Sequence, residues 1–147
     1  MSRGWLLDTN VISELLKGTR ANRTVVEWIA EADEDRLYLS VITLGEIAKG
    51  IGLAEERGRD MRQQRDFLHR ALPERFGERV LPFDTEAAIA WGRLLQRLKG
   101  NRQDERVLAI DAQIAATAEV ASLTLCSRNV RDFVRLGFND IVNPFAD

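Results

Sequence analysis

The sequence predicts an α/β protein, a three-layer α/β/α sandwich around a mostly parallel central sheet. Short apolar runs alternate with longer segments of helical periodicity along almost the whole chain. Strands that alternate with helices form parallel sheets, whose right-handed crossovers place helices on both faces. The chain has 147 residues, a length that favours one domain with a single core, so we expect one domain over residues 1–147.

The elements follow one another without a repeat, a low-complexity tract or a linker. The first strand leads directly into a helix, for which Asn10 is the expected N-cap. The expected strands are 5–7, 36–40, 80–83, 123–127 and 141–143, and the expected helices are 10–16, 22–32, 43–56, 59–76, 85–98, 104–121 and 129–136.

Composition excludes several kinds of site. The only histidine, His69, lies in a polar helical stretch, and the only cysteine, Cys126, is expected to be buried in a strand. Histidine-based triads, Cys/His zinc sites and an internal disulfide are therefore excluded. No apolar run has the length of a membrane span and no signal peptide is visible, so we expect a cytoplasmic protein with no membrane contact.

Charge is distributed unevenly along the chain. The net charge is −2, which gives no support to a generic nucleic-acid binder. Residues 57–106 nevertheless carry a basic excess between two acidic segments. This middle segment forms either a basic surface beside an acidic site or a solvated helical face of mixed charge. The numbers of basic and acidic residues alone favour the face of mixed charge.

Acidic residues follow the predicted strands. Asp8 comes directly after the first strand, and ligands of open α/β sheets gather outside the carboxyl ends of the strands. Capping the next helix would explain Asp8 equally well. Glu46 follows the second strand, where Thr43 and Glu46 also fit a capping box. After the third strand, an N-cap role explains Asp84 better than catalysis does.

Three polar residues follow the fourth strand. Ser127 ends this strand, Asn129 is the expected N-cap of the next helix, and Asp132 takes the third position of that helix. Capping accounts for Asn129 and Asp132. Ser127 and Asn129 nevertheless lie at the same strand-end edge as Asp8.

Asp111 is the acidic residue without a local explanation. Its neighbours three and four positions away on the predicted helix are Val107, Leu108, Ile114 and Ala115, all apolar. A buried charge must be paired with an arginine, protonated or bound to a metal. Converging carboxylates repel one another, which raises their pKa values and destabilises the fold, and a divalent cation removes this destabilisation. Because every donor is an oxygen, we expect Mg²⁺ or Mn²⁺, which suits phosphodiester hydrolysis.

Six segments, taken together and in order, resemble one known family. They are Leu6–Glu14, Leu39–Glu46, Leu81–Asp84, Asp111–Ala118, Ser127–Phe133 and Asn143–Phe145. Over nearly the whole chain, the sequence resembles PIN-domain ribonucleases, and within them the VapC-type and FitB-like toxins of type II toxin–antitoxin pairs. Each segment alone is a weak signal, but their combination in this order is highly specific.

The resemblance implies a catalytic site. Asp8, Glu46 and Asp111 would form the acidic triad, with Asp8 and Asp111 binding the metal and Glu46 orienting or deprotonating the attacking water. Asn129 matches the family's fourth position, an Asp or Asn, but brings no charge, so the site would hold one metal firmly rather than two. Ser127 stands where the family often has threonine. The expected site residues are Asp8, Glu46, Asp111, Ser127, Asn129 and Asp132.

The predicted function is a Mg²⁺-dependent endoribonuclease toxin. The resemblance also implies RNA as substrate, a cognate antitoxin, DNA contacts only through that antitoxin, and a homodimer. An alternative is a non-catalytic subunit of an antitoxin-bound DNA-binding repressor complex, in which the acidic pocket receives an antitoxin arginine. A phosphoacceptor receiver domain is disfavoured, because no acid pair lies near the first strand and no lysine follows Lys99.

Overall fold

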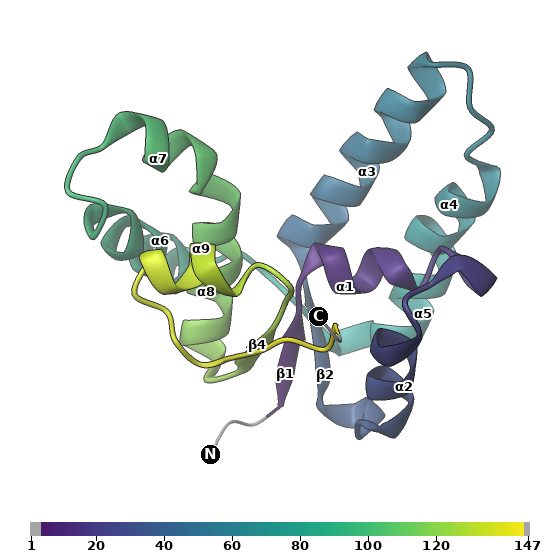
Figure 1. The fold of residues 1–147 in the computed structure, drawn as a ribbon, viewed down its shortest axis with the longest axis horizontal. Coiled ribbons are helices and arrows are strands. Elements are labelled where there is room, and N and C mark those ends of the chain that lie inside the picture. Colours follow the sequence, from purple (N-terminus) through teal and green to yellow (C-terminus); the bar gives the residue numbers. More distant parts are fainter. Residues whose placement is uncertain (1–3, 146–147) are drawn as a thin grey trace.

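Within residues 4–145, five parallel strands form a single sheet. The sheet lies at the centre of the molecule (Figure 1). The computed structural model describes residues 4–145, so the ends of the predicted domain, 1–3 and 146–147, lie outside the described residues. The order across the sheet is β3-β2-β1-β4-β5. The strands are β1 (Trp5–Leu7), β2 (Leu37–Ser40), β3 (Val80–Leu81), β4 (Thr124–Cys126) and β5 (Ile141–Val142). The predicted fold class is confirmed.

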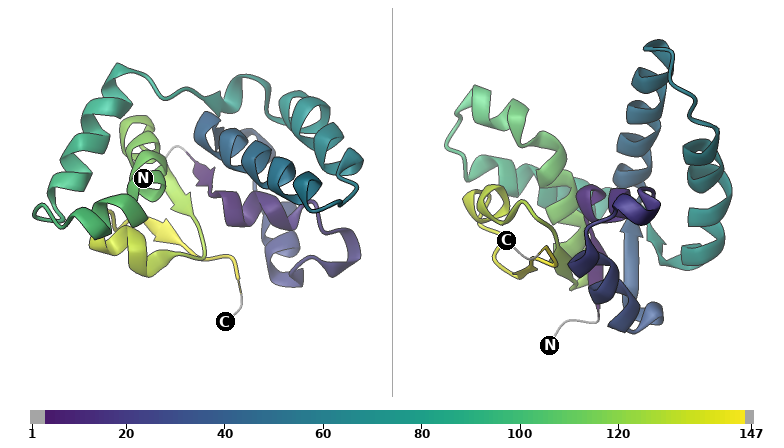
Figure 2. Two further views of the ribbon diagram at one scale, coloured as in Figure 1. Left: turned by 90° about the horizontal axis from the view of Figure 1, so that it is seen from above. Right: turned by 45° about the vertical axis from the view of Figure 1, so that its right-hand side comes forward.

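Helices cover both faces of this sheet. They are α1 (Thr9–Glu14), α2 (Arg23–Glu31), α3 (Val41–Glu56), α4 (Arg62–Asp66), α5 (Leu72–Phe76), α6 (Thr85–Gln96), α7 (Arg102–Val107), α8 (Ala109–Ala121) and α9 (Val130–Arg135). Helices α1–α5 lie on one side and α6–α9 on the other, and the two groups spread apart beyond the sheet (Figures 1 and 2). No helix within residues 4–145 combines the length and the apolar character that a membrane span needs.

Each face of the sheet has its own hydrophobic core. Successive strand side chains point to opposite faces, and accordingly Leu6 and Leu125 pack with α6, α8 and α9. Leu7 and Cys126 pack with α1, α2, α3 and α5 on the other face. Cys126 is buried and free, as the sequence predicts.

The predicted helix 104–121 is wrong as a single element. It consists of α7 and α8, which meet at Leu108, whose backbone angles are φ −98° and ψ 7°. The break lets Leu108 enter the core at 1% exposure, while Val107 remains 68% exposed. Asp111 therefore lies in the first turn of a helix and not in the middle of a long one.

Two predicted N-caps are also wrong, because the helices start earlier than expected. Asp8 caps α1, its Oδ1 accepting the Thr9 backbone N–H at 2.8 Å, so Asn10 lies inside the helix. Ser40 caps α3, so Thr43 and Glu46 form no capping box. The Glu46 side chain is thereby available for other contacts.

The other two predicted caps have opposite outcomes. Asp84 caps α6, as predicted, and its Oδ1 accepts the Ala87 backbone N–H at 3.0 Å. Asn129 precedes α9 but makes no side-chain capping hydrogen bond, which corrects that prediction.

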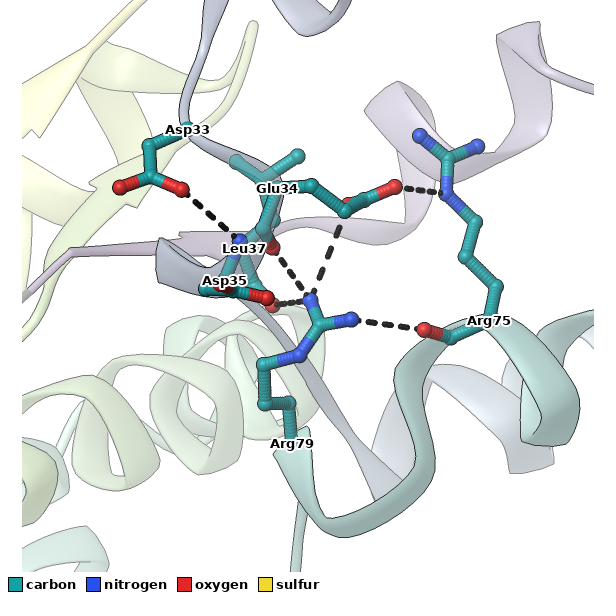
Figure 3. A network of polar contacts seen from close by, with 6 residues as sticks. All are labelled: Asp33, Glu34, Asp35, Leu37, Arg75 and Arg79. Carbon is teal, nitrogen blue, oxygen red and sulfur yellow. Dashed lines mark hydrogen bonds and ion pairs between the residues drawn. The ribbon is translucent and has the colours of Figure 1, made fainter.

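A guanidinium ties α5 and the turn after it to the amino end of β2 (Figure 3). Arg79 Nη1 donates to the carbonyl oxygens of Glu34 and Leu37 at 2.6 Å each, and its Nη2 donates to the Arg75 carbonyl at 2.6 Å. Arg75 Nε donates to Glu34 Oε1 at 2.7 Å. This network secures the end of the sheet opposite to the strand ends that carry Asp8 and Ser40.

Acidic side chains pair with many of the basic side chains of residues 57–106. These pairs include Arg62–Asp60, Arg65–Glu55, Arg70–Asp66, Arg70–Glu74, Arg75–Glu34, Arg79–Glu34 and Arg93–Glu119. These are mostly exposed, and exposed pairs contribute little to stability. The segment therefore has a solvated face of mixed charge, the alternative that the sequence counts favour.

Candidate active site

The site is built where the order of the sheet reverses. The chain runs outward from β1 to β2 and β3, then returns to the other side of β1 with β4 and β5. In open parallel sheets, such a switch point leaves a crevice at the carboxyl ends of the two central strands. Leu7 pairs with Cys126, so the next residues, Asp8 and Ser127, emerge side by side at this crevice.

Asp8 is held in place by three donors. It is 3% exposed, and its Oδ2 accepts from the fully buried Ser127 Oγ at 2.6 Å and from Asn10 Nδ2 at 3.2 Å. Its Oδ1 accepts the Thr9 N–H. Burial raises the pKa of Asp8 above its ordinary value and the nearby Glu46 charge adds to this, while the hydrogen bonds act in the opposite direction. Asp8 therefore combines a helix-capping role with a fixed position at the crevice.

Glu46 projects from the second turn of α3 toward the start of α1. The Thr9 hydroxyl donates to Glu46 Oε1 at 2.5 Å and lies 3.1 Å from the Thr43 hydroxyl. Glu46 Oε2 makes no hydrogen bond within residues 4–145. One carboxylate oxygen is thus fixed and the other is free to accept a proton or a ligand.

Asp111 approaches from α8 and lies at the edge of its apolar face. Leu108, Ile114 and Ala115 are buried, but Val107 is exposed and Asp111 itself is only partly buried. The sequence therefore overstates its burial. The first turn of a helix favours a negative charge, since backbone N–H groups point outward there.

Carboxylates surround Asp111, and no described cation compensates for them. Burial raises the pKa of Asp111 to about 7, and the charges of Asp8, Asp132 and Glu46 add to the increase. Across residues 4–145, no lysine or arginine forms an ion pair with Asp111, so the salt-bridge explanation is wrong. Asp8, Glu46 and Asp132 are therefore all close enough to repel the charge of Asp111 at the crevice.

Glu14 shows how a structural buried acid differs. It is 6% exposed, and it forms an ion pair with Lys17 and accepts the Asn22 backbone N–H at 2.7 Å. Burial alone would raise the pKa of Glu14, but these partners hold it below its ordinary value. Asp111 has no such partners.

The residues after β4 contribute in different ways. Asp132 lies near enough for its charge to raise the pKa of Asp111. Asn129 is exposed, and its backbone N–H donates to Ser127 Oγ at 3.0 Å, while its side chain makes no described contact with the carboxylates. Ser127 is therefore the link between Asn129 and Asp8.

Thr9 and Asn10 are site residues that the sequence did not predict. Besides Asp8, Asn10 Nδ2 contacts Ser127 Oγ at 3.3 Å, and Asn10 Oδ1 accepts the Arg128 backbone N–H at 3.3 Å. These two polar side chains directly follow an acid at the end of a strand, and this pattern could have predicted their role in the site. An N-cap role was already a sufficient explanation for Asn10.

The donor set fits a hard divalent cation. The side chains that converge carry oxygen ligands only, and the repulsion around Asp111 is the penalty that a cation would relieve. Within residues 4–145, no three acidic, histidine or cysteine side chains are already gathered into a cage. Mg²⁺ keeps several waters and uses one or two carboxylates, so Asp8 and Asp111 suffice as candidate ligands.

Comparison with known proteins identifies the family of this chain. The family model of the PIN domain matches residues 5–139. The chain belongs to the PIN-domain family. The relatives of this PIN domain include Toxin FitB of Neisseria gonorrhoeae, 33% identical over 142 residues that cover 97% of this chain and 99% of that protein. VapC ribonuclease Y4jK of Sinorhizobium fredii is 35% identical over 140 residues, which cover 95% and 96% of the two chains.

A solved structure shares the fold of this PIN domain. The structure of FitAB bound to an IR36 DNA fragment matches with a TM-score of 0.79 and 29% sequence identity, covering 97% of this chain and 96% of that one. The family resemblance predicted from the six sequence segments is thus confirmed.

Proposed function

We propose that this PIN domain is the toxin of a type II toxin–antitoxin pair and acts as a Mg²⁺-dependent endoribonuclease. The observation that carries the proposal is Asp111, a partly buried carboxyl whose pKa of about 7 reflects burial and three neighbouring acids without a described counter-ion. The names of the relatives, a toxin and a VapC ribonuclease, support the same function.

The proposed mechanism assigns a task to each acid. Asp8 and Asp111 hold the Mg²⁺ or Mn²⁺, which when bound supplies positive charge to the phosphate and its attacking water. Glu46 orients this water through its free Oε2 and accepts its proton as the water oxygen bonds to phosphorus and the bond to the leaving oxygen breaks. Thr9 keeps Glu46 in place through the hydrogen bond to Oε1.

The remaining residues position the site. Ser127 and Asn10 fix the orientation of Asp8, and the Asn129 backbone N–H in turn fixes Ser127. Asp132 assists through its negative charge beside Asp111.

The proposed partner is a cognate antitoxin that inserts an arginine or lysine among Asp8, Glu46 and Asp111. A cation of this kind pairs with the carboxylates and displaces the metal. We also propose a homodimer in the cytoplasm that reaches DNA only through the antitoxin. The DNA-bound FitAB structure is consistent with such an arrangement.

The alternative is a non-catalytic subunit of an antitoxin-bound DNA-binding repressor complex. The DNA in the FitAB structure favours it. The two functions differ in one property: the free protein cuts RNA only if it is an enzyme.

The test is RNA cleavage by the purified chain, freed from any partner, with Mg²⁺ and with EDTA. We expect cleavage with Mg²⁺, none with EDTA, and a loss on the order of 10²–10⁴-fold for Glu46→Gln, because the proton acceptor is removed. The exposed Asp35→Asn variant removes the same charge elsewhere and should cleave normally. Cleavage that survives EDTA and Glu46→Gln, or no cleavage by the parent, would refute the proposal.

A further inference from the structure

A groove of about 340 Å³ opens between α3 and α8, directly beside the acidic site. One wall is the first part of α3, including Glu46, and the other consists of Ile110 and Gln113 of α8. Figure 1 shows these two helices on opposite sides of β1. Because Glu46 belongs to both the site and the groove, a molecule bound at the carboxylates would extend into the groove.

The walls of the groove are apolar and open to solvent. Val41 on α3 is 38% exposed and Ile110 on α8 is 41% exposed. Ligand sites are typically lined by apolar groups with a few polar ones, and their volumes start near about 300 Å³. The flat faces of unpaired RNA bases are suited to such walls, since RNA is recognised mainly through splayed-out single-stranded bases.

Lys49 supplies a positive charge in this groove. It lies three residues after Glu46 on α3, and residues at that spacing share one side of a helix. Lys49 makes no ion pair or hydrogen bond within residues 4–145, in contrast to Arg65 and Arg70, which form ion pairs with acidic side chains. A lysine without an ion-pair partner can bind a phosphate group through a charge-assisted hydrogen bond. Because Lys49 lies beside the acidic site, this phosphate would be the neighbour of the one that is cut.

Gln113 supplies hydrogen-bonding groups on the opposite wall. Its backbone carbonyl accepts the Thr117 hydroxyl at 2.9 Å, but its side-chain amide has no partner within the described residues. A side-chain amide offers two donors and an acceptor, the set that reads the edge of a base.

We propose that the groove is the subsite for the nucleotide adjacent to the scissile phosphodiester, with its base between Val41 and Ile110, its edge at Gln113 and its phosphate at Lys49. This inference rests on the proposed ribonuclease function and adds a source of sequence preference to it. The positive charge of Lys49 favours RNA over an apolar protein segment as the occupant of the groove, because an apolar segment would offer Lys49 no anionic partner.

The test uses Lys49→Gln, Gln113→Leu and, as a control, Lys99→Gln in the α6–α7 loop. Lys49→Gln should raise KM and leave kcat nearly unchanged. It should also lower the slope of log KM against log salt concentration by about one, because one contact to a phosphate is lost. Gln113→Leu should alter the nucleotide preference at a single position beside the cleavage site, as read by sequencing of RNA fragment ends. Lys99→Gln should change neither property.

A second measurement does not depend on cleavage. In an Asp111→Asn background, fluorescence anisotropy with a short single-stranded RNA should show weaker binding for Lys49→Gln and for Ile110→Trp, which fills the groove. Unchanged KM, salt slope, preference and binding in a parent that cleaves RNA would overturn the subsite and leave the proposed function intact. An Ile110→Trp variant that cleaves normally but no longer self-associates would also overturn it, since the groove would then bind a second copy. A parent without ribonuclease activity would instead refute the proposed function.

Discussion

Replacing Asp111 by Asn should stabilise the metal-free protein in a pH-dependent way. The pKa of Asp111 is about 7 in the folded protein, raised from an ordinary value of 3.8. Between these values the folded state holds a proton that the unfolded chain has released, so the free energy of unfolding falls as the pH rises through this window. Asn keeps the shape of Asp but does not titrate. The advantage of the variant should therefore grow from about pH 4 to about pH 7 and then level off.

The size of the effect follows from the same pKa. One pH unit corresponds to about 1.4 kcal/mol, so a carboxyl fully shielded from water would cost about 4 kcal/mol once deprotonated. Asp111 is partly exposed, and screening reduces this to on the order of 1–2 kcal/mol. For a domain of this size, about 1 kcal/mol changes the Tm by roughly 2–4 °C. The variant should melt roughly 2–8 °C above the parent at about pH 8 in EDTA.

The assay is thermal unfolding of the parent, Asp111→Asn and the control Asp35→Asn across this pH range, in EDTA and in Mg²⁺. If Mg²⁺ binds the parent with a Kd of about 1 mM, about 10 mM should add roughly 1.4 kcal/mol, and Asp111→Asn should lose this increment. Asp35→Asn should follow the parent in both conditions. A large drop in Tm for Asp111→Asn in EDTA would sink the reasoning, because it would reveal a buried cation left without its partner.

Two further substitutions separate the site from the scaffold. Ser127→Ala removes the 2.6 Å hydrogen bond to Asp8 and should cost about 1–3 kcal/mol of unfolding free energy in denaturant titrations. It should also reduce RNA cleavage, and an unchanged rate would argue against a positioning role. Asp84→Ala removes the cap of α6 and should cost about 1 kcal/mol without affecting cleavage. A cleavage defect in Asp84→Ala would show that Asp84 does more than cap α6.

The sequence predicts the sheet and most of its helices because local patterns determine them. Apolar runs such as residues 123–127 predict buried strands, and apolar residues at helical spacing, as in 22–32, predict the buried face of a helix. Asp84 predicts the start of α6. The position of Asp8 and Ser127 at strand ends also follows from sequence. Their direct contact requires the register of β1 with β4, which no local pattern contains.

Tertiary packing decides the features that the sequence misses. The break at Leu108 buries a leucine at the cost of helix continuity, and the same break moves Asp111 into a helix terminus. Ser40 replaces Thr43 as the cap of α3, which is a choice between two equally suitable residues. The hydrogen bond from Thr9 to Glu46 joins two helices and is therefore invisible to any reading along the chain.

The position of β1 between β2 and β4 also fixes when the site is completed during translation. The hydrogen bond from Ser127 to Asp8 spans 119 positions of sequence. A nascent chain carries Asp8 and Glu46 out of the ribosome well before Asp111 and Ser127 are made, and contacts of such long range form late. For the proposed ribonuclease, this order keeps the growing chain inactive beside the ribosome and messenger that produce it. The proposed site is complete only when β4 has docked against β1.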